Sequence, residues 1–346
     1  MEREARFFGE KTETGIRCIL CPNRCEIPDG SFGACGVRGN RDGKGVIPFY
    51  GHVTALALDP IEKKPLFHFR PGSEILSVGF AGCNLRCPFC QNWRISRGPS
   101  SGASVPGERV TPAEIVSTAI DKGSRAIAYT YSEPLVHAEF LLDCMSLARE
   151  RGIANVLVTN GCVEPEAAHE ILSLTDAANI DLKCFSKDTY AQTLGGDMET
   201  VLAFIRLAQS KKVHVELTTL VVPGMNDSPE ELDACADFIF PLNTYHEAEL
   251  FEIPWHLSAY HPNYQWKAPS TDPEVLLDAK KRAKNKLMYV YTGNIPGEEN
   301  NTFCDHCGVL LVRRLGYRTE TFGLEVVEGE LLYRCERCGG PTCIVC

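Results

Sequence analysis

The stretch from residue 72 to residue 297 alternates short apolar runs with segments that carry helix signals. The runs are rich in β-branched residues and read EILSVGFAG, RAIAYTYS, NVLVTNG, AANIDLK, VHVELTTLVV and AELFEIP. Helices are expected from Thr111 and Pro112, where Glu114 completes a capping box, and over 134–151, 164–175, 197–211 and 228–239. Strands that alternate with helices indicate parallel β–α units. The fold class is therefore α/β.

The number of these units limits the kind of sheet they can form. Six units in about 220 residues favour a partial (β/α)6, TIM-like barrel over a complete one with eight units. A doubly wound open sheet is the structural alternative. The run LMYVYTGNI is a candidate for one further strand.

The cysteines gather in three places. Of the seventeen, four lie between Cys18 and Cys35, three between Cys83 and Cys90, and six between Cys304 and Cys346. The charged N-terminal sequence MEREARFFGEKTETG has no apolar segment of the secretory type. We therefore expect a cytoplasmic protein whose cysteines bind metal rather than form disulfides. The remaining four are expected to be small buried apolar residues: Cys144, Cys162, Cys184 and Cys235.

The cysteine clusters suggest three domains. Residues 1–71 form a Cys-rich, Gly-rich N-terminal segment, residues 72–297 the β–α core, and residues 298–346 a C-terminal Cys-rich module. The last is too short to bury a sizeable core, so its cysteines are expected to close it around metal.

The central cysteines carry the clearest chemical signal. In GFAGCNLRCPFCQNW, Cys83, Cys87 and Cys90 follow the spacing C-x-x-x-C-x-x-C directly after an apolar run. Thiolates are soft ligands that select iron–sulfur clusters, zinc or copper. Three thiolates can hold three irons of a 4Fe–4S cluster and leave the fourth iron open, at the end of a barrel where active sites lie. The alternative is a zinc knuckle.

At these residues the chain resembles the radical S-adenosylmethionine (SAM) superfamily. In that family the open iron binds the amino and carboxylate groups of SAM, and reduction yields a 5′-deoxyadenosyl radical. The family also places an aromatic residue before the third cysteine, beside the adenine, and Phe89 stands there. The resemblance therefore implies a 4Fe–4S cluster and SAM as cofactors.

Later segments extend the resemblance to the pyruvate formate-lyase activating enzyme group. YTYSEP stands where the family has a Gly-Gly-Glu segment, although the glycines are absent. VTNG, DLK and PWH resemble that group's strand ends and its late histidine motif. The SAM-binding residues implied by this resemblance are Ser132, Glu133, Asn160, Asp181, Lys183 and His256. No residue that touches the substrate can be named from the sequence.

The two outer clusters have enough thiolates to be closed metal sites. Cys18, Cys21, Cys25 and Cys35 fit either a structural zinc or a second, electron-carrying iron–sulfur cluster, and unmetallated thiols are a third possibility. The C-terminal pairs CDHC and CERC resemble a zinc ribbon and supply Cys304, Cys307, Cys335 and Cys338. Cys343 and Cys346 have no assigned role.

The order of the motifs narrows the resemblance to one subfamily. CPNRCEIPDGSFGACGVRGN, GCNLRCPFCQNW, PWHLSAYHPNYQW, YVYTGNIPG and CDHCGVLLVRRLGY are similar to the AmmeMemoRadiSam system radical SAM proteins. The resemblance implies AMMECR1-domain and Memo-domain proteins as partners, together with a one-electron reductant such as a flavodoxin or ferredoxin. The net charge of -10 disfavours nucleic-acid binding, and no apolar run is long enough for a membrane span.

The function expected from these features is reductive cleavage of SAM followed by hydrogen abstraction from a substrate. Two alternatives stay open. The first is a glycyl-radical-enzyme activating enzyme, which rests on analogy. The second is a non-catalytic metal-binding scaffold built on the two outer cysteine modules.

Overall fold

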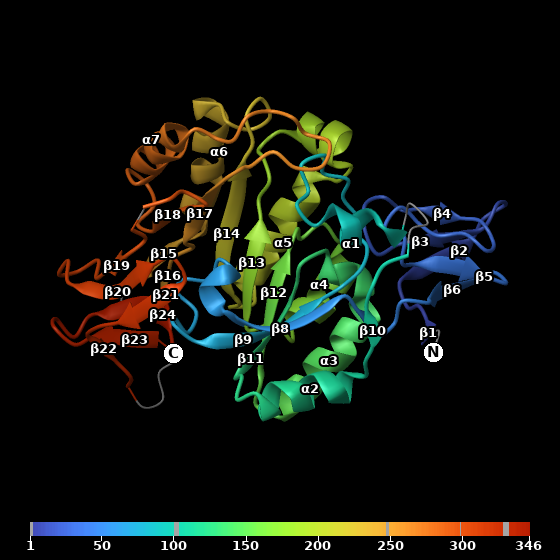
Figure 1. Cartoon of the computed structure of the whole chain (residues 1–346), viewed down its shortest axis with the longest axis horizontal. Helices are drawn as coiled ribbons and strands as arrows, with labels where there is room; N and C mark the ends of the chain where they lie inside the picture. The colour runs from blue at the N-terminus through green and yellow to red at the C-terminus, as the bar shows by residue number, and fades with distance from the viewer. Residues whose placement is uncertain (1–2, 100–103, 247–248, 298, 328–331) are drawn as a thin grey trace.

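The computed structural model describes residues 3–99, 104–246, 249–297, 299–327 and 332–346. At its centre lies one eight-stranded sheet in the order β18-β17-β14-β13-β12-β11-β9-β8 (Figure 1). Its parallel strands are β9 (Glu74–Gly79), β11 (Ala126–Thr130), β12 (Ala154–Thr159), β13 (Ala177–Asp181), β14 (His214–Val221), β17 (Trp255–Ala259) and β18 (Val290–Gly293). An antiparallel edge strand, β8 (Ala55–Pro60), pairs with β9.

The parallel sheet predicted from the sequence is confirmed, including β18 from the run LMYVYTGNI. The sheet curves but does not close, because its edge strands β8 and β18 do not pair with each other. One predicted strand forms, but outside the core sheet. In AELFEIP, β16 (Glu249–Phe251) pairs with β15 (Thr244–His246) in a separate hairpin, and the core strand is the next segment, β17.

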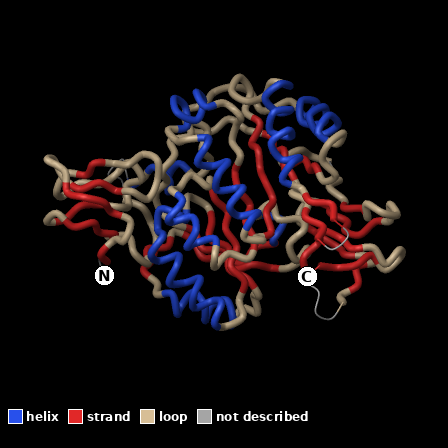
Figure 2. Tube along the Cα trace, turned by 180° about the vertical axis from the view of Figure 1, so that it is seen from behind, coloured by secondary structure: helices blue, strands red, loops and turns tan. Residues whose placement is uncertain are grey.

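Helices cover the outer face of the sheet (Figures 1 and 2). They are α2 (Pro112–Asp121), α3 (Ala138–Glu150), α4 (Pro165–Leu172), α5 (Met198–Ser210), α6 (Pro229–Ile239) and α7 (Pro273–Ala283). The predicted capping box at the start of α2 is present, with reciprocal bonds between Thr111 and Glu114. Short helical segments complete the core: η1 (Ile61–Lys63), α1 (Trp93–Arg97), η3 (Pro134–His137), the π-helix η4 (Thr189–Leu194) and η5 (Phe240–Leu242).

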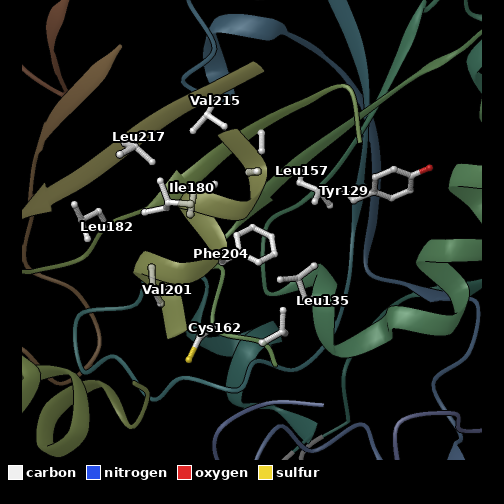
Figure 3. Packing of buried hydrophobic residues seen from close by; sticks show 14 of the residues in the cluster. Tyr129, Leu135, Leu157, Cys162, Ile180, Leu182, Val201, Phe204, Val215 and Leu217 are labelled. Carbon is white, nitrogen blue, oxygen red and sulfur yellow. The ribbon is translucent and has the colours of Figure 1, made fainter. Parts of the chain in front are cut away.

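The main hydrophobic core lies between this helical layer and the sheet. Strand residues such as Leu157, Ile180 and Leu217 pack against Val201 and Phe204 of α5 (Figure 3). The four isolated cysteines are at most 1% exposed, as expected for small apolar residues: Cys144, Cys162, Cys184 and Cys235.

The segment that follows β8 packs against the inner face of the sheet. Ile61, Leu66 and Phe69 pack there against small strand residues such as Ala128 and Ala177. This plug occupies the amino ends of the parallel strands, so the carboxyl ends are left to form a site.

The N-terminal segment forms two three-stranded sheets beside α3 (blue in Figure 1). One contains β1 (Arg3–Glu4), β6 (Lys44–Ile47) and β5 (Gly39–Arg41); the other contains β2 (Phe8–Lys11), β3 (Ile16–Cys18) and β4 (Glu26–Ile27). A further pair joins β7 (His52–Val53) to β10 (Glu108–Arg109). A buried ion pair between Arg38 and Glu139, 2.8 Å between Nη1 and Oε2, ties this segment to the core.

The C-terminal residues form two more three-stranded sheets at the opposite end of the molecule (red in Figure 1). They are β19 (Thr302–Phe303), β20 (Leu310–Leu315) and β21 (Arg318–Thr321), then β22 (Leu324–Glu325), β23 (Leu332–Cys335) and β24 (Pro341–Val345). The expected boundary at residue 298 lies outside the described residues. Within the described chain, no helix combines the length and apolar character that crossing a membrane requires.

Candidate active site at the carboxyl ends of the parallel strands

The three central cysteines lie on the loop that follows β9. Gly82, with φ +83°, turns the chain there, and the backbone N–H of Leu85 donates to Cys83 Sγ at 3.4 Å. Burial raises the pKa of the Cys83 thiol well above its usual value and that of Cys87 to about 11. Without a positive metal centre these thiols therefore stay protonated at neutral pH, and metal binding would release their protons.

The cysteine loop is held in place by the chain that follows β17. The backbone N–H groups of Gln265 and Trp266 both donate to the carbonyl of Pro88, each at 2.9 Å. The ring of Tyr264 stacks on Trp93, the first residue of α1, at 5.1 Å between centroids. These contacts fix the turn between the second and third cysteines from outside the loop itself.

Glu133 follows β11, the strand next to β9. Its carboxylate is 1% exposed and accepts hydrogen bonds from Thr159 Oγ1 at 2.6 Å, Asn160 N at 2.8 Å and Leu135 N at 3.0 Å. Burial raises its pKa to about 7, although these three donors oppose that shift. A cation bound nearby would favour the ionised carboxylate. The neighbouring Ser132 bonds instead to the carbonyl of Phe80, at 2.8 Å.

Asn160, at the end of β12, links Glu133 to the cysteine loop. Its Nδ2 lies 3.7 Å from Cys83 Sγ and 2.9 Å from Asn84 Oδ1. Asn84 in turn donates to the carbonyl of Cys162 at 2.6 Å. Asn84 and Thr159 could not be selected from the sequence, because their hydrogen-bond partners lie many residues away in the chain.

Asp181 is the last residue of β13, and it forms an ion pair of 2.9 Å with Lys183, two residues further along the chain. Burial disfavours the charge of Lys183, but the nearby Asp181 and Cys87 outweigh it and raise its pKa. Asn226 Nδ2 donates to the carbonyl of Lys183 at 2.6 Å and so fixes this strand end. Lys183 therefore places a positive charge beside the second cysteine.

The structure does not bring His256 to this group. Its Nε2 lies 2.7 Å from Glu216 Oε2, and its ring packs edge-on against Phe67 at 4.7 Å. Glu216 also accepts from the backbone N–H groups of Phe67 and His68 and from His214 Nε2. His256 thus contacts the plug on the inner face of the sheet. Phe89 is 3% exposed and packs within the main core.

These donors fit a cluster with one open position. Three thiols come from a single loop, and the polar groups around them include the amide of Asn160, the hydroxyl of Ser96 and the Asp181–Lys183 pair. The buried carboxylate of Glu133 could receive an ammonium group. The arrangement suits an amino acid derivative that binds through the metal.

A cavity of about 830 Å³ adjoins the outer side of the loop. It is bordered by the N-terminal segment, the cysteine loop and the end of η4, and its charged lining residues are Arg86 and Arg97.

The outer cysteines are arranged in two different ways. The four C-terminal Sγ atoms all lie within 4.8 Å of one another. Two of their pairs, Cys304–Cys338 and Cys307–Cys335, are 3.8 and 3.7 Å apart. The four N-terminal thiols line one small cavity together with apolar side chains: Cys18, Cys21, Cys25 and Cys35.

Comparison with known proteins places the core in a family. The sequence profile described as the Radical SAM superfamily matches residues 77–239. Uncharacterized protein MJ0808 of Methanocaldococcus jannaschii is 39% identical over 346 residues, 99% of each chain. Pyruvate formate-lyase 1-activating enzyme of Escherichia coli is 27% identical over 222 residues, 63% of this chain and 86% of that protein.

A solved structure, that of Streptococcus suis SuiB, has a TM-score of 0.49 and 13% identity over 64% of this chain and 48% of that chain.

Members of the Radical SAM superfamily are enzymes, and membership implies a 4Fe–4S cluster, SAM and a reductant. From the matched profile, the full-length relative and the three-cysteine loop after the first parallel strand, the chain belongs to the radical SAM superfamily.

Proposed function

We propose that the protein cleaves SAM reductively at a 4Fe–4S cluster held by Cys83, Cys87 and Cys90. When bound, the cluster and SAM supply a 5′-deoxyadenosyl radical, which abstracts a hydrogen atom from a substrate. The observation that carries the proposal is the gathering of three neighbouring strand ends around one three-cysteine loop. Asn160 reaches Cys83, and Lys183 lies close enough to Cys87 to shift its pKa.

The protein's own residues would bind and orient SAM. Glu133, buried and already bonded to Thr159 and Asn160, would accept the SAM ammonium group. Lys183 and Asp181, paired with each other, would face polar groups of SAM at the next strand end. Burial of these groups strengthens each charge-assisted hydrogen bond that they make.

Production of 5′-deoxyadenosine tests the proposal. Anaerobically reconstituted protein, given SAM and dithionite, should release 5′-deoxyadenosine, and Cys87→Ala should release less than about 1% of that amount because the cluster loses a ligand. Cys144→Ala is the matched control: it makes the same substitution at a cysteine that lies in the main core and has no proposed role in binding the cluster. Full activity in Cys87→Ala would overturn the assignment.

A glycine on a partner protein is a second candidate substrate. It is supported by similarity to pyruvate formate-lyase activating enzymes, 27% identical in Escherichia coli and in Clostridium pasteurianum. An activating enzyme would generate a glycyl radical, visible by electron paramagnetic resonance, when incubated with a glycyl-radical protein, SAM and reductant. A small molecule or peptide substrate would leave that protein without a radical.

The C-terminal four-cysteine site is proposed to hold structural zinc. A zinc ion about 2.3 Å from each of four thiolates sets sulfur–sulfur distances of about 3.8 Å, which the two closest pairs match. A purified protein that contained only zinc and no iron after reconstitution would instead favour the scaffold function.

The cysteine sites also bear on the cellular location and the partners that we propose. Their thiols must be reduced to bind metal, which suits the cytoplasm. A flavodoxin or ferredoxin would supply the electron. By subfamily resemblance, AMMECR1-domain and Memo-domain proteins are proposed as partners, and co-purification from cells that produce all three would test this.

A further inference from the structure

The spacing of the N-terminal thiols differs from that of the zinc-like site. Among the described residues, the four C-terminal cysteines are the group of three or more possible metal ligands whose ligand atoms all lie within 4.8 Å of one another. No three of Cys18, Cys21, Cys25 and Cys35 form such a group, and neither do the three central cysteines. In this respect the N-terminal set is like the loop proposed to hold a cluster. Four thiols further apart than a zinc tetrahedron leave room for a larger inorganic core between them.

The cavity between these thiols has one polar group that lacks a partner. Arg38 lines the cavity and is 1% exposed. Both terminal nitrogens of its guanidinium bind Glu139, at 2.8 and 3.0 Å, whereas its Nε has no acceptor among the described residues. The remaining walls are apolar and include Leu20, Ile27 and Val136. An anionic occupant that carries sulfur acceptors would satisfy the buried Nε–H.

We propose that Cys18, Cys21, Cys25 and Cys35 bind a second 4Fe–4S cluster. All four irons would have protein ligands, so this cluster would carry electrons rather than bind a substrate. The backbone N–H of Ala34, which donates to Cys25 Sγ at 3.4 Å, is the kind of contact that tunes such a centre.

The N-terminal site directly adjoins the central cysteine loop. Asn23, between Cys21 and Cys25, donates from Nδ2 to the carbonyl of Asn84 at 2.8 Å. On the other side of Cys83, a Cβ added to Gly82 would lie 2.6 Å from the carbonyl oxygen of Cys35. The two cysteine groups are thus joined through the residues that flank Cys83.

This adjacency gives the second cluster a role, which rests on the proposed SAM cleavage. A flavodoxin or ferredoxin would reduce the N-terminal cluster by one electron. That cluster would return to its oxidised state as the same electron passes to the cluster on the central loop, which is reduced by one electron. No atom is transferred in this step.

Metal and sulfide analysis tests the site without any need for SAM cleavage. The variant Cys83→Ala/Cys87→Ala/Cys90→Ala, reconstituted anaerobically with iron and sulfide, should retain about four irons and four sulfides per chain. Iron without sulfide, or zinc in the N-terminal site, would overturn the proposal. A failure of wild-type protein to cleave SAM would contradict the proposed function but would leave this result intact.

A second pair of variants covers the chance that the triple variant misfolds. Cys18→Ser/Cys35→Ser should lower iron from about eight to about four per chain, whereas Cys144→Ser/Cys235→Ser, in the main core, should keep all eight. Unchanged iron together with loss of one zinc would contradict the proposal. In Cys18→Ser/Cys35→Ser, flavodoxin should reduce the central cluster at least ten times more slowly than in wild type, as monitored by electron paramagnetic resonance. An unchanged rate of reduction would overturn the relay.

Discussion

The carboxylate of Glu133 is completely buried and accepts hydrogen bonds from three donors. Thr159, Asn160 and Leu135 satisfy it within the protein, so it does not need a ligand to be tolerated in the core. Its pKa of about 7, raised by burial, shows that ionisation is nonetheless costly there. An ammonium group is therefore the partner that would gain most from contact with this carboxylate.

Glu133→Gln should weaken SAM binding by roughly 10- to 150-fold, since a charge-assisted hydrogen bond contributes about 1.5–3 kcal/mol. Equilibrium dialysis with reconstituted protein measures the change. Glu170→Gln, at the surface on α4, should bind SAM as wild type does. Equal affinity of Glu133→Gln and wild type would remove Glu133 from the site.

Glu216 is a second buried carboxylate, and its hydrogen bonds stabilise the fold. Burial alone would raise its pKa, but hydrogen bonds and charge from His214 and His256 outweigh that and hold the pKa well below its usual value. Because the folded pKa is depressed, the stabilisation is present above the ordinary carboxyl pKa and is lost as pH falls below it. The carboxylate joins the plug to strands β14 and β17.

Glu216→Gln should reduce the free energy of unfolding by about 1–3 kcal/mol at pH 7. The difference from wild type should narrow as pH falls below about 4.5, because the unfolded wild-type chain binds a proton there while the folded carboxylate stays ionised down to its lower pKa. Urea denaturation at a series of pH values measures this. A difference that stays constant with pH would show that the Glu216 charge does not stabilise the fold.

At the scale of elements, the sequence predicted the alternation of strands and helices because each run has its own local pattern. The run AELFEIP was misassigned because a short apolar segment looks the same in a hairpin and in a core strand. The plug after β8 was not foreseen, since its apolar residues become informative only once they pack inside the curved sheet. Likewise, His256 was selected from a strand-end motif, but its partner Glu216 is on another strand.

Cys304→Ser/Cys335→Ser should lose about one zinc per chain and should unfold the C-terminal sheets, because the proposed zinc would hold their small core together. Elemental analysis and limited proteolysis would show both effects. Cys343→Ser changes a buried cysteine outside the four and should keep the zinc. Full zinc content in Cys304→Ser/Cys335→Ser would exclude this site as the zinc ligand set.

At the scale of the whole molecule, cysteine modules flank the sheet at both ends (Figure 1). The C-terminal module is joined to the core through Arg314, whose guanidinium lies 4.3 Å from the Phe67 ring centroid and donates a hydrogen bond to the Phe67 carbonyl. The N-terminal module instead meets the cysteine loop. The two modules therefore differ in what they contact as well as in thiol spacing.

Arg314→Ala should lower the free energy of unfolding by about 2–4 kcal/mol, because it leaves the Phe67 carbonyl in the core and the Thr302 hydroxyl unpaired and opens a cavity. Guanidinium denaturation measures the loss. Arg313→Ala, on the exposed side of the same strand, should be nearly neutral. Equal stability of the two variants would show that Arg314 does not hold the C-terminal module to the core.

The loop of Cys83, Cys87 and Cys90 is proposed to hold a cluster with one iron open to SAM. Electron paramagnetic resonance of the reduced protein, recorded before and after SAM is added, tests it most directly. The measurement should use Cys18→Ser/Cys35→Ser, so that only the central cluster contributes to the spectrum. The spectrum should change when SAM is added, because SAM would bind the open iron. An identical spectrum with and without saturating SAM would contradict it.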